Sequence, residues 1–257
     1  MITPPYLQIS ELSASFTSQL GELEALEDVS LSIAHGEFVC IIGPSGCGKS
    51  SLLRTIAGLI KPTQGQILLM GLPYTQPSLR IGLVFQQANL LPWRTVRENI
   101  ALPLHLSKAS TQEINVITKD LIRRVGLVGF EDELPMNLSG GMAQRTAIAR
   151  VLAQNPEVLL LDEPFGQLDA ITRELMGNEL LRIWEQDKRT VLMVTHDVEE
   201  AALLADRVVV LTQRPGHVAT IVDVHIDRPR YNTQRSDPEL QRVAEKLRQA
   251  LRSLTES

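Results

Sequence analysis

The stretch Gly43-Pro44-Ser45-Gly46-Cys47-Gly48-Lys49-Ser50 decides the fold of this 257-residue chain. It fits the pattern of a glycine, four residues and then Gly-Lys-Ser, and it stands between an apolar run at 37–42 and a helical pattern at 49–57. In such a loop the glycines let successive backbone N–H groups turn toward an anion, and the following helix presents its positive end. The motif predicts a phosphate-binding loop, although an isolated match can also be a structural turn.

Individual residues of this loop have expected tasks. Lys49 is expected to reach the β and γ phosphates of a nucleotide, and the Ser50 hydroxyl to ligate Mg²⁺. Cys47 lies at a helix N-terminus, which tends to lower a thiol pKa, but the position can equally be one that needs a small side chain. The expected phosphate-binding set is Gly43, Pro44, Ser45, Gly46, Cys47, Gly48, Lys49, Ser50 and Ser51.

A pair of adjacent acids ends a later apolar run. Residues 158–161 predict a buried strand, and Asp162 and Glu163 follow it. Because successive side chains of a strand point to opposite faces, the two carboxylates can serve different tasks, Asp162 toward Mg²⁺ and Glu163 as general base toward an attacking water. The alternative is a pair of acids that caps the strand in solvent. With the loop, the pair predicts a phosphate-loop NTPase, a class that includes GTPases, kinases and helicases.

Short apolar runs and helical patterns predict an α/β fold. Several runs are apolar throughout and alternate with helical segments, which is typical of a parallel sheet covered on both faces; besides the two above, they lie at 67–70, 81–85, 191–195, 208–211 and 218–222. Between residues 89 and 154 helical patterns take over, at 96–106, 111–125 and 139–153. We interpret the chain as a nucleotide-binding core of residues 1–88 with 155–225, an inserted helical subdomain of residues 89–154 and a tail of residues 226–257. The alternative is one continuous α/β domain with longer helices.

Composition and charge exclude several classes of protein. The net charge of 25 − 30 = −5 lacks the basic footprint of a protein that covers many phosphates, so no nucleic-acid partner is expected. The two cysteines, Cys40 and Cys47, cannot form a disulfide framework in a chain of this size. The N-terminus has no signal-peptide pattern, and no apolar run approaches the ~18 residues of a membrane span. We expect a soluble or peripheral protein of the cytoplasm.

A second helix that begins with glycines indicates which kind of phosphate-loop NTPase this chain is. Leu138-Ser139-Gly140-Gly141-Met142-Ala143-Gln144-Arg145 offers Ser139 as an N-cap and two glycines that leave backbone N–H groups unobstructed. One nucleotide does not need a second anion-binding helix end, so this one is expected to serve the phosphate of another subunit. The stretch resembles the signature of the ATP-binding cassette family, with Met142 in place of the commoner glutamine.

Other motifs of that family follow in order over residues 6–225. Gln86, after the run 81–85, resembles the glutamine of the loop that joins sheet and helical domains, near Mg²⁺ and the water. Asp169 resembles the aspartate of the loop that crosses the dimer interface, although Gln167 replaces the usual alanine. His196 resembles the switch histidine that can bond the γ-phosphate. Phe16 takes the place of the aromatic that stacks on adenine, with Tyr6 as its rival.

The resemblance implies a RecA-like core with a parallel central sheet, an N-terminal antiparallel β part and the inserted helical subdomain. It implies an ATPase that uses ATP and Mg²⁺, with Glu163, His196 and Gln86 catalytic and with Mg²⁺ held by Ser50, Gln86 and Asp162. It also implies a head-to-tail dimer, of identical subunits or close paralogues, in which Ser139, Gly140, Gly141 and Gln144 act on the partner's ATP.

Finer detail is similar to the nitrate, sulfonate, taurine and bicarbonate import subfamily. This likeness rests on stretches that include 90–99, 205–211, Arg214-Pro215-Gly216 and Arg228-Pro229-Arg230. It implies two transmembrane permease subunits, an indirect partnership with a substrate-binding protein, and a peripheral location on the cytoplasmic face of the inner membrane. The alternatives are an importer of a thiamine precursor, an exporter ATPase, a soluble cassette ATPase of translation or DNA repair, and a stand-alone regulator.

Two segments have open roles. Leu90, Leu91 and Trp93 can line a groove for a permease or pack inside the helical subdomain. The C-terminal helical pattern carries an apolar stripe of Leu240, Val243, Leu247, Leu251 and Leu254. We expect this helix to pack on the chain's own core, with partner binding as the alternative.

Overall fold

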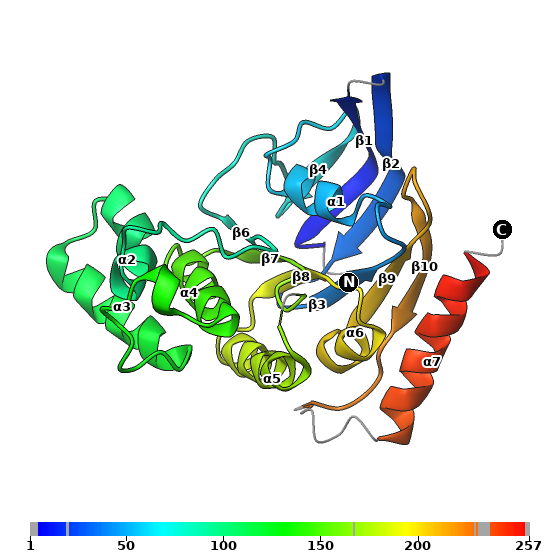
Figure 1. Cartoon of the computed structure of the whole chain (residues 1–257). Coiled ribbons are helices and arrows are strands. Elements are labelled where there is room, and N and C mark those ends of the chain that lie inside the picture. Colours follow the sequence, from blue (N-terminus) through cyan, green and yellow to red (C-terminus); the bar gives the residue numbers. More distant parts are fainter. Residues whose placement is uncertain (1–4, 19–20, 167, 229, 231–236, 255–257) are drawn as a thin grey trace. The chain divides into compact units, whose positions relative to one another are not determined.

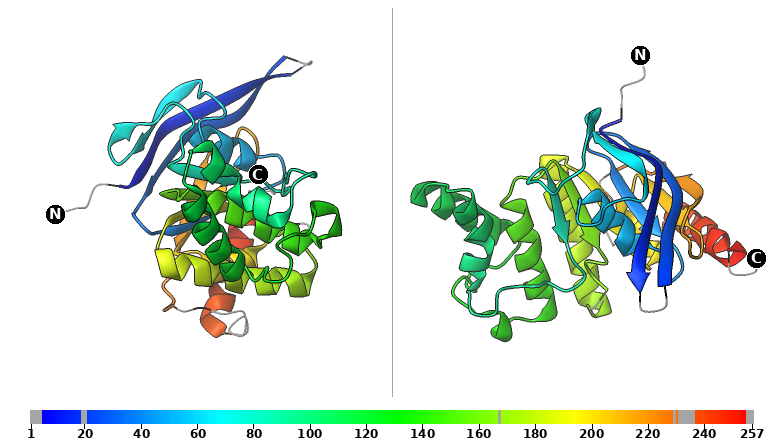
Figure 2. Two further views of the ribbon diagram at one scale, coloured as in Figure 1. Left: turned by 90° about the vertical axis from the view of Figure 1, so that its left-hand side faces the viewer. Right: turned by 90° about the horizontal axis from the view of Figure 1, so that it is seen from above.

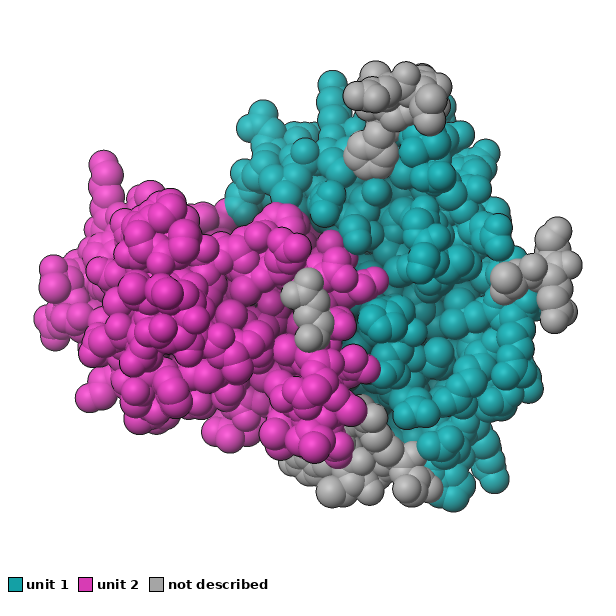
Figure 3. Space-filling model, in the orientation of Figure 1, with its two compact units in different colours: residues 1–78, 188–257 teal, residues 79–187 magenta. Residues whose placement is uncertain are grey.

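The computed structural model describes residues 5–18, 21–166, 168–228, 230 and 237–254, apart from the side chains of residues 16–18, 21 and 22. The chain forms two compact units, coloured separately in Figure 3. Unit 1 comprises residues 1–78 and 188–257, and unit 2 comprises residues 79–187.

Unit 1 begins with an antiparallel sheet in the order β2-β1-β4-β5, whose two long strands form the blue ribbon of Figure 2. Its strands are β1 (Leu7–Ser18), β2 (Gly21–Ile33), β4 (Gln64–Leu69) and β5 (Leu72–Pro73). In β1, alternate residues such as Leu7 and Ile9 are buried while the residues between them are not, which is the pattern of a sheet with one solvated face. The N-terminal antiparallel part is therefore confirmed.

The second sheet of unit 1 has the strand order β10-β9-β3-β8. Its strands are β3 (Phe38–Ile42), β8 (Thr190–Val194), β9 (Arg207–Leu211) and β10 (Val218–Asp223). β3 pairs in parallel with both β8 and β9, whereas β10 pairs antiparallel with β9. The parallel strands β3 and β8 are buried at every residue, as predicted. The runs at 67–70 and 218–222 belong to half-exposed strands, and both strands are antiparallel.

The helices in the described part of unit 1 are α1 (Lys49–Ile56), α6 (Val198–Leu204) and α7 (Pro238–Ser253). α1 buries Leu52, Leu53 and Ile56, as its spacing predicts. α7 buries Leu240, Ala244 and Leu247 and packs on α6, β9 and β10 (Figure 1). The C-terminal helix therefore packs on the chain's own core, as expected.

In its described residues, unit 2 combines a pair of parallel strands with four α-helices. β6 (Ile81–Val84) pairs in parallel with β7 (Val158–Asp162). The helices are α2 (Val96–Leu106), α3 (Thr111–Arg124), α4 (Gly140–Leu152) and α5 (Ala170–Asp187), with a short 3₁₀ turn at Pro135–Asn137. Capping boxes begin α2 and α3, where Thr95 pairs with Glu98 and Ser110 with Glu113. The helices predicted between residues 96 and 153 are confirmed to within two residues; the predicted domain boundaries stay a prediction.

Candidate functional site

The phosphate loop connects the end of β3 to the start of α1 in unit 1. Gly46 and Gly48 adopt positive φ angles of 76° and 103°, which favour glycine. A Cβ on Gly48 would lie 2.5 Å from the backbone oxygen of Ala25, so this position also admits no larger residue. A Cβ on Gly46 would meet nothing within 4 Å, so open space adjoins the loop there. The loop therefore has the glycine geometry that a phosphate cradle requires.

Lys49 lies within the loop that precedes it. Its Nζ donates hydrogen bonds to the carbonyl oxygens of Gly43, at 2.8 Å, and Pro44, at 2.9 Å. The side chain is only 7% exposed. The ammonium group is therefore held at the loop, and phosphate oxygens can take the place of these carbonyl contacts.

Cys47 is buried in the loop. Only 1% of the residue is exposed, and burial raises the pKa of its thiol, an effect that the nearby Lys49 ammonium opposes without overcoming. The expectation that the helix N-terminus lowers this pKa is wrong, because desolvation of the thiolate outweighs the helix and the lysine. The structure supports the other interpretation, a position that needs a small side chain.

A segment distant in sequence supports the loop from behind. Gly216 donates its N–H to the Ala25 oxygen at 3.0 Å and accepts from the Glu27 N–H at 3.1 Å. A Cβ on Gly216 would lie 2.1 Å from the Cys47 oxygen, so the two backbones are in direct contact. Sequence reasoning noticed Arg214-Pro215-Gly216 only as a subfamily likeness. The dipeptide Pro-Gly after a strand was the available signal for a close backbone approach.

His196 follows β8 and precedes α6. The residue is exposed, and its neighbours are fixed: the Asp197 carboxylate caps α6 by accepting from Glu199 N–H at 2.9 Å and Glu200 N–H at 3.1 Å. On the other side, the Thr195 hydroxyl donates to the buried Glu200 carboxylate and accepts from Asp197 N–H at 3.0 Å. The histidine is thus presented by a turn with little freedom.

The acidic pair of unit 2 separates as strand geometry predicts. Asp162, the last residue of β7, is 3% exposed, whereas Glu163 is half-buried and has a positive φ of 44°. Gln86 donates from Nε2 to Oε2 of Glu163 at 2.9 Å. A Cβ on Gly166 would lie 3.4 Å from that oxygen, so the turn after Glu163 also lies against its carboxylate. The structure therefore brings together Glu163 and Gln86, two residues expected to be catalytic.

A metal at this site would need oxygen ligands from a nucleotide. Among the residues that the structure describes, no group of three or more His, Cys, Asp or Glu side chains could hold a metal ion. Mg²⁺ commonly binds through one or two carboxylates together with substrate phosphates, and the carboxylate of Asp162 at the end of β7 is a donor of that type.

The signature stretch begins α4. Ser139 is the N-cap and accepts from the Met142 N–H at 3.3 Å, and Ser139 and Gly140 are both exposed. A Cβ on Gly141 would lie 2.7 Å from the Cγ2 of Thr172, so α5 approaches this helix end closely. Asp169 precedes α5, and hydrogen bonds from Thr172 lower the pKa of its exposed carboxyl. An uncovered helix N-terminus with a nearby carboxylate therefore faces solvent.

Two residues of α4 bind the main chain on both sides of Gln86. Gln144, only 4% exposed, donates from Nε2 to the Phe85 oxygen at 3.2 Å. Arg150 donates to the oxygens of Ala88, at 3.0 Å, and Asn89, at 2.9 Å. The contact of Gln144 with a partner's nucleotide stays a prediction; in the structure its amide donates to the main chain of its own subunit. Arg150 was missed, because nothing in the sequence marks its long-range carbonyl partners.

Phe16, the aromatic residue expected to stack on adenine, is described only in its backbone. Its side chain lies outside the described part of the chain, and so does Gln167. Its rival Tyr6 packs edge-on against His35, with ring centroids 4.7 Å apart. Tyr6 therefore has a structural contact of its own.

Comparisons with known proteins agree with these motifs. Residues 26–166 match the ABC transporter family. An uncharacterised ABC transporter ATP-binding protein of Methanocaldococcus jannaschii is 49% identical over 227 residues, or 88% of this chain and 85% of that protein. The aliphatic sulfonates import ATP-binding protein SsuB of Bacillus thuringiensis is 44% identical, covering 91% and 92% of the two chains. The nitrate import ATP-binding protein NrtD of Synechococcus elongatus is 46% identical, covering 88% and 83%.

Solved structures show the same fold. A dimeric bacterial ABC transporter cassette has a TM-score of 0.77 and 34% identity over 86% of this chain and 100% of its own. A dimeric ATP-binding cassette in a post-hydrolysis state with ADP and phosphate has a TM-score of 0.76 and 33% identity, with the same coverage.

Proposed function

The chain belongs to the ABC transporter family, and from this premise we propose that it is the ATP-hydrolysing subunit of an importer for a small anion or organic nutrient. The observation that carries the import assignment is the identity of 44% and 46% to sulfonate and nitrate import ATP-binding proteins, over about nine-tenths of the chain. Nitrate, a sulfonate such as taurine, or bicarbonate is the proposed class of substrate.

The phosphate loop binds the triphosphate of ATP in this proposal. Lys49 exchanges its carbonyl partners for the β and γ phosphates, and the backbone N–H groups of the loop from Ser45 to Ser51 stabilise the remaining negative charge. Ser50, Asp162 and Gln86 hold Mg²⁺, which when bound screens the phosphate charge. Phe16 stacks on adenine.

Glu163 is the general base of hydrolysis. Its carboxylate accepts the Gln86 amide hydrogen at 2.9 Å, which orients one oxygen and leaves the other to accept a proton from water. His196 bonds the γ-phosphate from its capped turn after β8, so that it responds to the loss of that phosphate.

The exposed signature helix end acts on a second subunit's nucleotide. Ser139, Gly140 and Gly141 offer a hydroxyl and N–H groups to the partner's γ-phosphate, and Asp169 lies at the dimer interface. The partner is a second copy or a close paralogue. ATP closes this head-to-tail dimer because only the triphosphate reaches both subunits. Hydrolysis removes that link, and the dimer opens.

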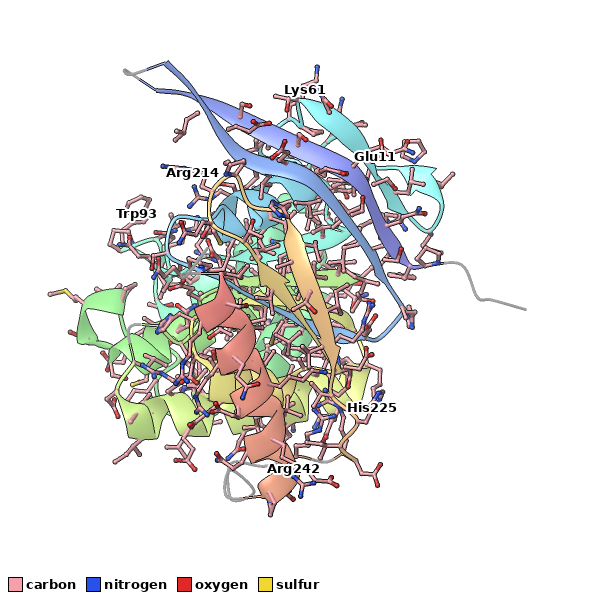
Figure 4. All side chains as sticks on the ribbon, turned by 90° about the vertical axis from the view of Figure 1, so that its right-hand side faces the viewer. Glu11, Lys61, Trp93, Arg214, His225 and Arg242 are labelled. Atoms are coloured by element: carbon pink, nitrogen blue, oxygen red, sulfur yellow. The ribbon has the colours of Figure 1, made fainter. Side chains whose placement is uncertain are left out.

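In this proposal, the closing and opening of the ATPase dimer act on two membrane permease subunits. Among the described residues, no helix is both long and apolar enough to cross a membrane. Trp93 is 71% exposed and projects outward in Figure 4, while the buried Asn99 side chain bonds the main chain at Leu91, Arg94 and Thr95 and fixes the turn that carries it. We assign this turn to permease docking, on the cytoplasmic face of the inner membrane. A separate binding protein delivers the substrate from the other side.

A pull-down tests this function. A tagged Glu163→Gln variant, which holds ATP without turnover, is incubated with ATP and Mg²⁺ in detergent-solubilised membranes of its own host, and its partners are identified by mass spectrometry. The matched control adds Trp93→Ala to the same variant. We expect a multi-span permease that is recovered with Glu163→Gln and largely lost with the control.

Recovery of other proteins in the pull-down would contradict parts of this proposal. Ribosomal or repair proteins in place of a permease would overturn the transport assignment and favour a soluble cassette ATPase. A permease recovered equally by both variants would remove Trp93 from the docking surface and leave the importer assignment standing.

A further inference from the structure

The C-terminal segment of unit 1 holds α6, the helix that follows His196, at both of its ends. At the first turn, Arg248 of α7 donates from Nη2 to Oε1 of Glu199 at 2.8 Å. At the last turn, Arg228 donates to the Leu204 oxygen and Arg230 donates to the Ala205 oxygen, each at 2.6 Å. A cationic side chain at a helix C-terminus also interacts favourably with the helix dipole. One continuous part of the chain thus contacts a helix of only seven residues at both ends.

Arg230 anchors this arrangement in the interior. The residue is 2% exposed, and besides Ala205 its guanidinium binds the carbonyl oxygens of Val224 and Ile226. Arg228 adds an ion pair with Asp206 at 2.8 Å. Removing a buried cation's partners is costly, so the main chain at Val224 and Ile226 keeps a fixed position relative to the end of α6.

The other end of α6 leads directly to the switch histidine. Glu199 lies three residues after His196, in the first turn that Asp197 caps, and the next residue, Glu200, is the buried partner of Thr195. Leu240, Ala244 and Leu247 hold α7 against α6 and the neighbouring strands. A shift of α7 would therefore be transmitted through Glu199 to the turn that presents His196.

We propose that α7 is a positioning element for the switch histidine, and that Arg248 is the positioning residue that acts through Glu199. This inference rests on the proposed role of His196 in hydrolysis. The expected signature is a change in turnover with nucleotide affinity preserved, because α7 packs on α6 and acts through it on the segment that senses the γ-phosphate.

The test compares three full-length variants. Arg248→Glu places a like charge against Glu199, and Glu199→Arg with Arg248→Glu restores an opposite pair in reverse. The matched control is Arg242→Glu, which changes the charge of the same helix equally at an exposed position near its start (Figure 4). Steady-state ATP hydrolysis gives kcat and KM, a fluorescent ATP analogue gives affinity, and thermal unfolding checks the fold.

For Arg248→Glu we expect kcat to fall about threefold, the size that suits a half-exposed ion pair, with ATP affinity unchanged. The charge-reversed pair should recover most of the loss, although Glu245, 3.5 Å from Arg248, repels the new glutamate. Unchanged kcat in Arg248→Glu, an equal loss in Arg242→Glu, or no recovery in the pair would each overturn the inference.

A fourth variant distinguishes failure of this inference from failure of the proposed role of His196 in hydrolysis. His196→Ala should lower kcat by much more than Arg248→Glu. If His196→Ala hydrolyses ATP normally, the proposed role of the histidine fails. If His196→Ala is slow and Arg248→Glu is normal, only the positioning role of α7 fails.

Discussion

The phosphate loop of unit 1 is shaped by main-chain contacts, whereas the acidic pair of unit 2 is shaped by side-chain hydrogen bonds. Around the loop, Gly48 approaches the Ala25 oxygen and Gly216 approaches the Cys47 oxygen so closely that no Cβ fits. Around Glu163, the Gln86 amide and the α4 side chains Gln144 and Arg150 do the positioning. A site built from backbone is sensitive to added volume, and a site built from polar side chains is sensitive to the loss of single hydrogen bonds.

The largest effect is expected at Glu163, the proposed general base in unit 2. Glu163→Gln keeps a hydrogen-bonding side chain but removes the carboxylate that we propose as the general base, so kcat should fall by about 10² to 10⁴. ATP affinity should be retained, because the phosphate loop lies in unit 1 and is unchanged. Hydrolysis measured by phosphate release and nucleotide binding measured separately check the split; rapid turnover would remove Glu163 from the role of base.

Added volume behind the phosphate loop should have the next largest effect. Gly216→Ala places a Cβ against the Cys47 oxygen, and overpacking costs ~1–3 kcal/mol, so ATP affinity should weaken about tenfold. The control is Gly71→Ala, where a Cβ meets nothing within 4 Å but φ is +76°. It should lose some stability and keep its ATP affinity. Equal nucleotide affinity in both variants would contradict the account of the loop.

Loss of one hydrogen bond beside Gln86 should have a smaller effect. Gln144→Ala leaves the Phe85 oxygen without its amide donor, a loss of about 1 kcal/mol, and kcat should fall roughly threefold to fivefold. Gln112→Ala removes the same side chain from an exposed position on α3 and should leave kcat unchanged. A fall in ATP affinity with normal kcat would place Gln144 outside the positioning of Gln86.

The smallest effect concerns thiol chemistry in the loop. Because burial raises the pKa of Cys47 above its usual value of 9.0, the neutral thiol persists at pH 7 and its alkylation should be slow. The alkylation rate should rise only when the pH exceeds the pKa of an ordinary cysteine thiol. Mass spectrometry of iodoacetamide-treated protein at several pH values checks this; fast labelling of Cys47 at pH 7 would contradict it.

The sequence predicts the residues that carry local patterns. Local patterns mark the phosphate loop, the two acids at the end of β7, the cap Ser139 and the buried strands β3 and β8, and the structure has these elements where they were expected. A strand buried on both faces needs an uninterrupted apolar run, so its burial can be predicted from its own residues.

Residues that act through distant partners could not be predicted in this way. Gly216 contacts Cys47 across about 170 residues of sequence, and Arg150 binds carbonyls of residues 88 and 89. Carbonyl oxygens are present at every residue, so no pattern distinguishes those that serve as partners. The expected lowering of the Cys47 pKa was wrong because burial of the thiol, which raises its pKa, depends on the folded surroundings and not on the local sequence pattern.

The most direct test of the central claim is whether the two halves of a site come from different subunits. Lys49→Ala disables the phosphate loop, and Ser139→Arg disables the signature; each variant alone should be nearly inactive. In a head-to-tail dimer, mixing them creates one intact site per mixed pair, so ATPase activity should rise well above the sum of the separate variants. Activity that stays at that sum, with both variants folded and dimer-competent, would contradict a shared site.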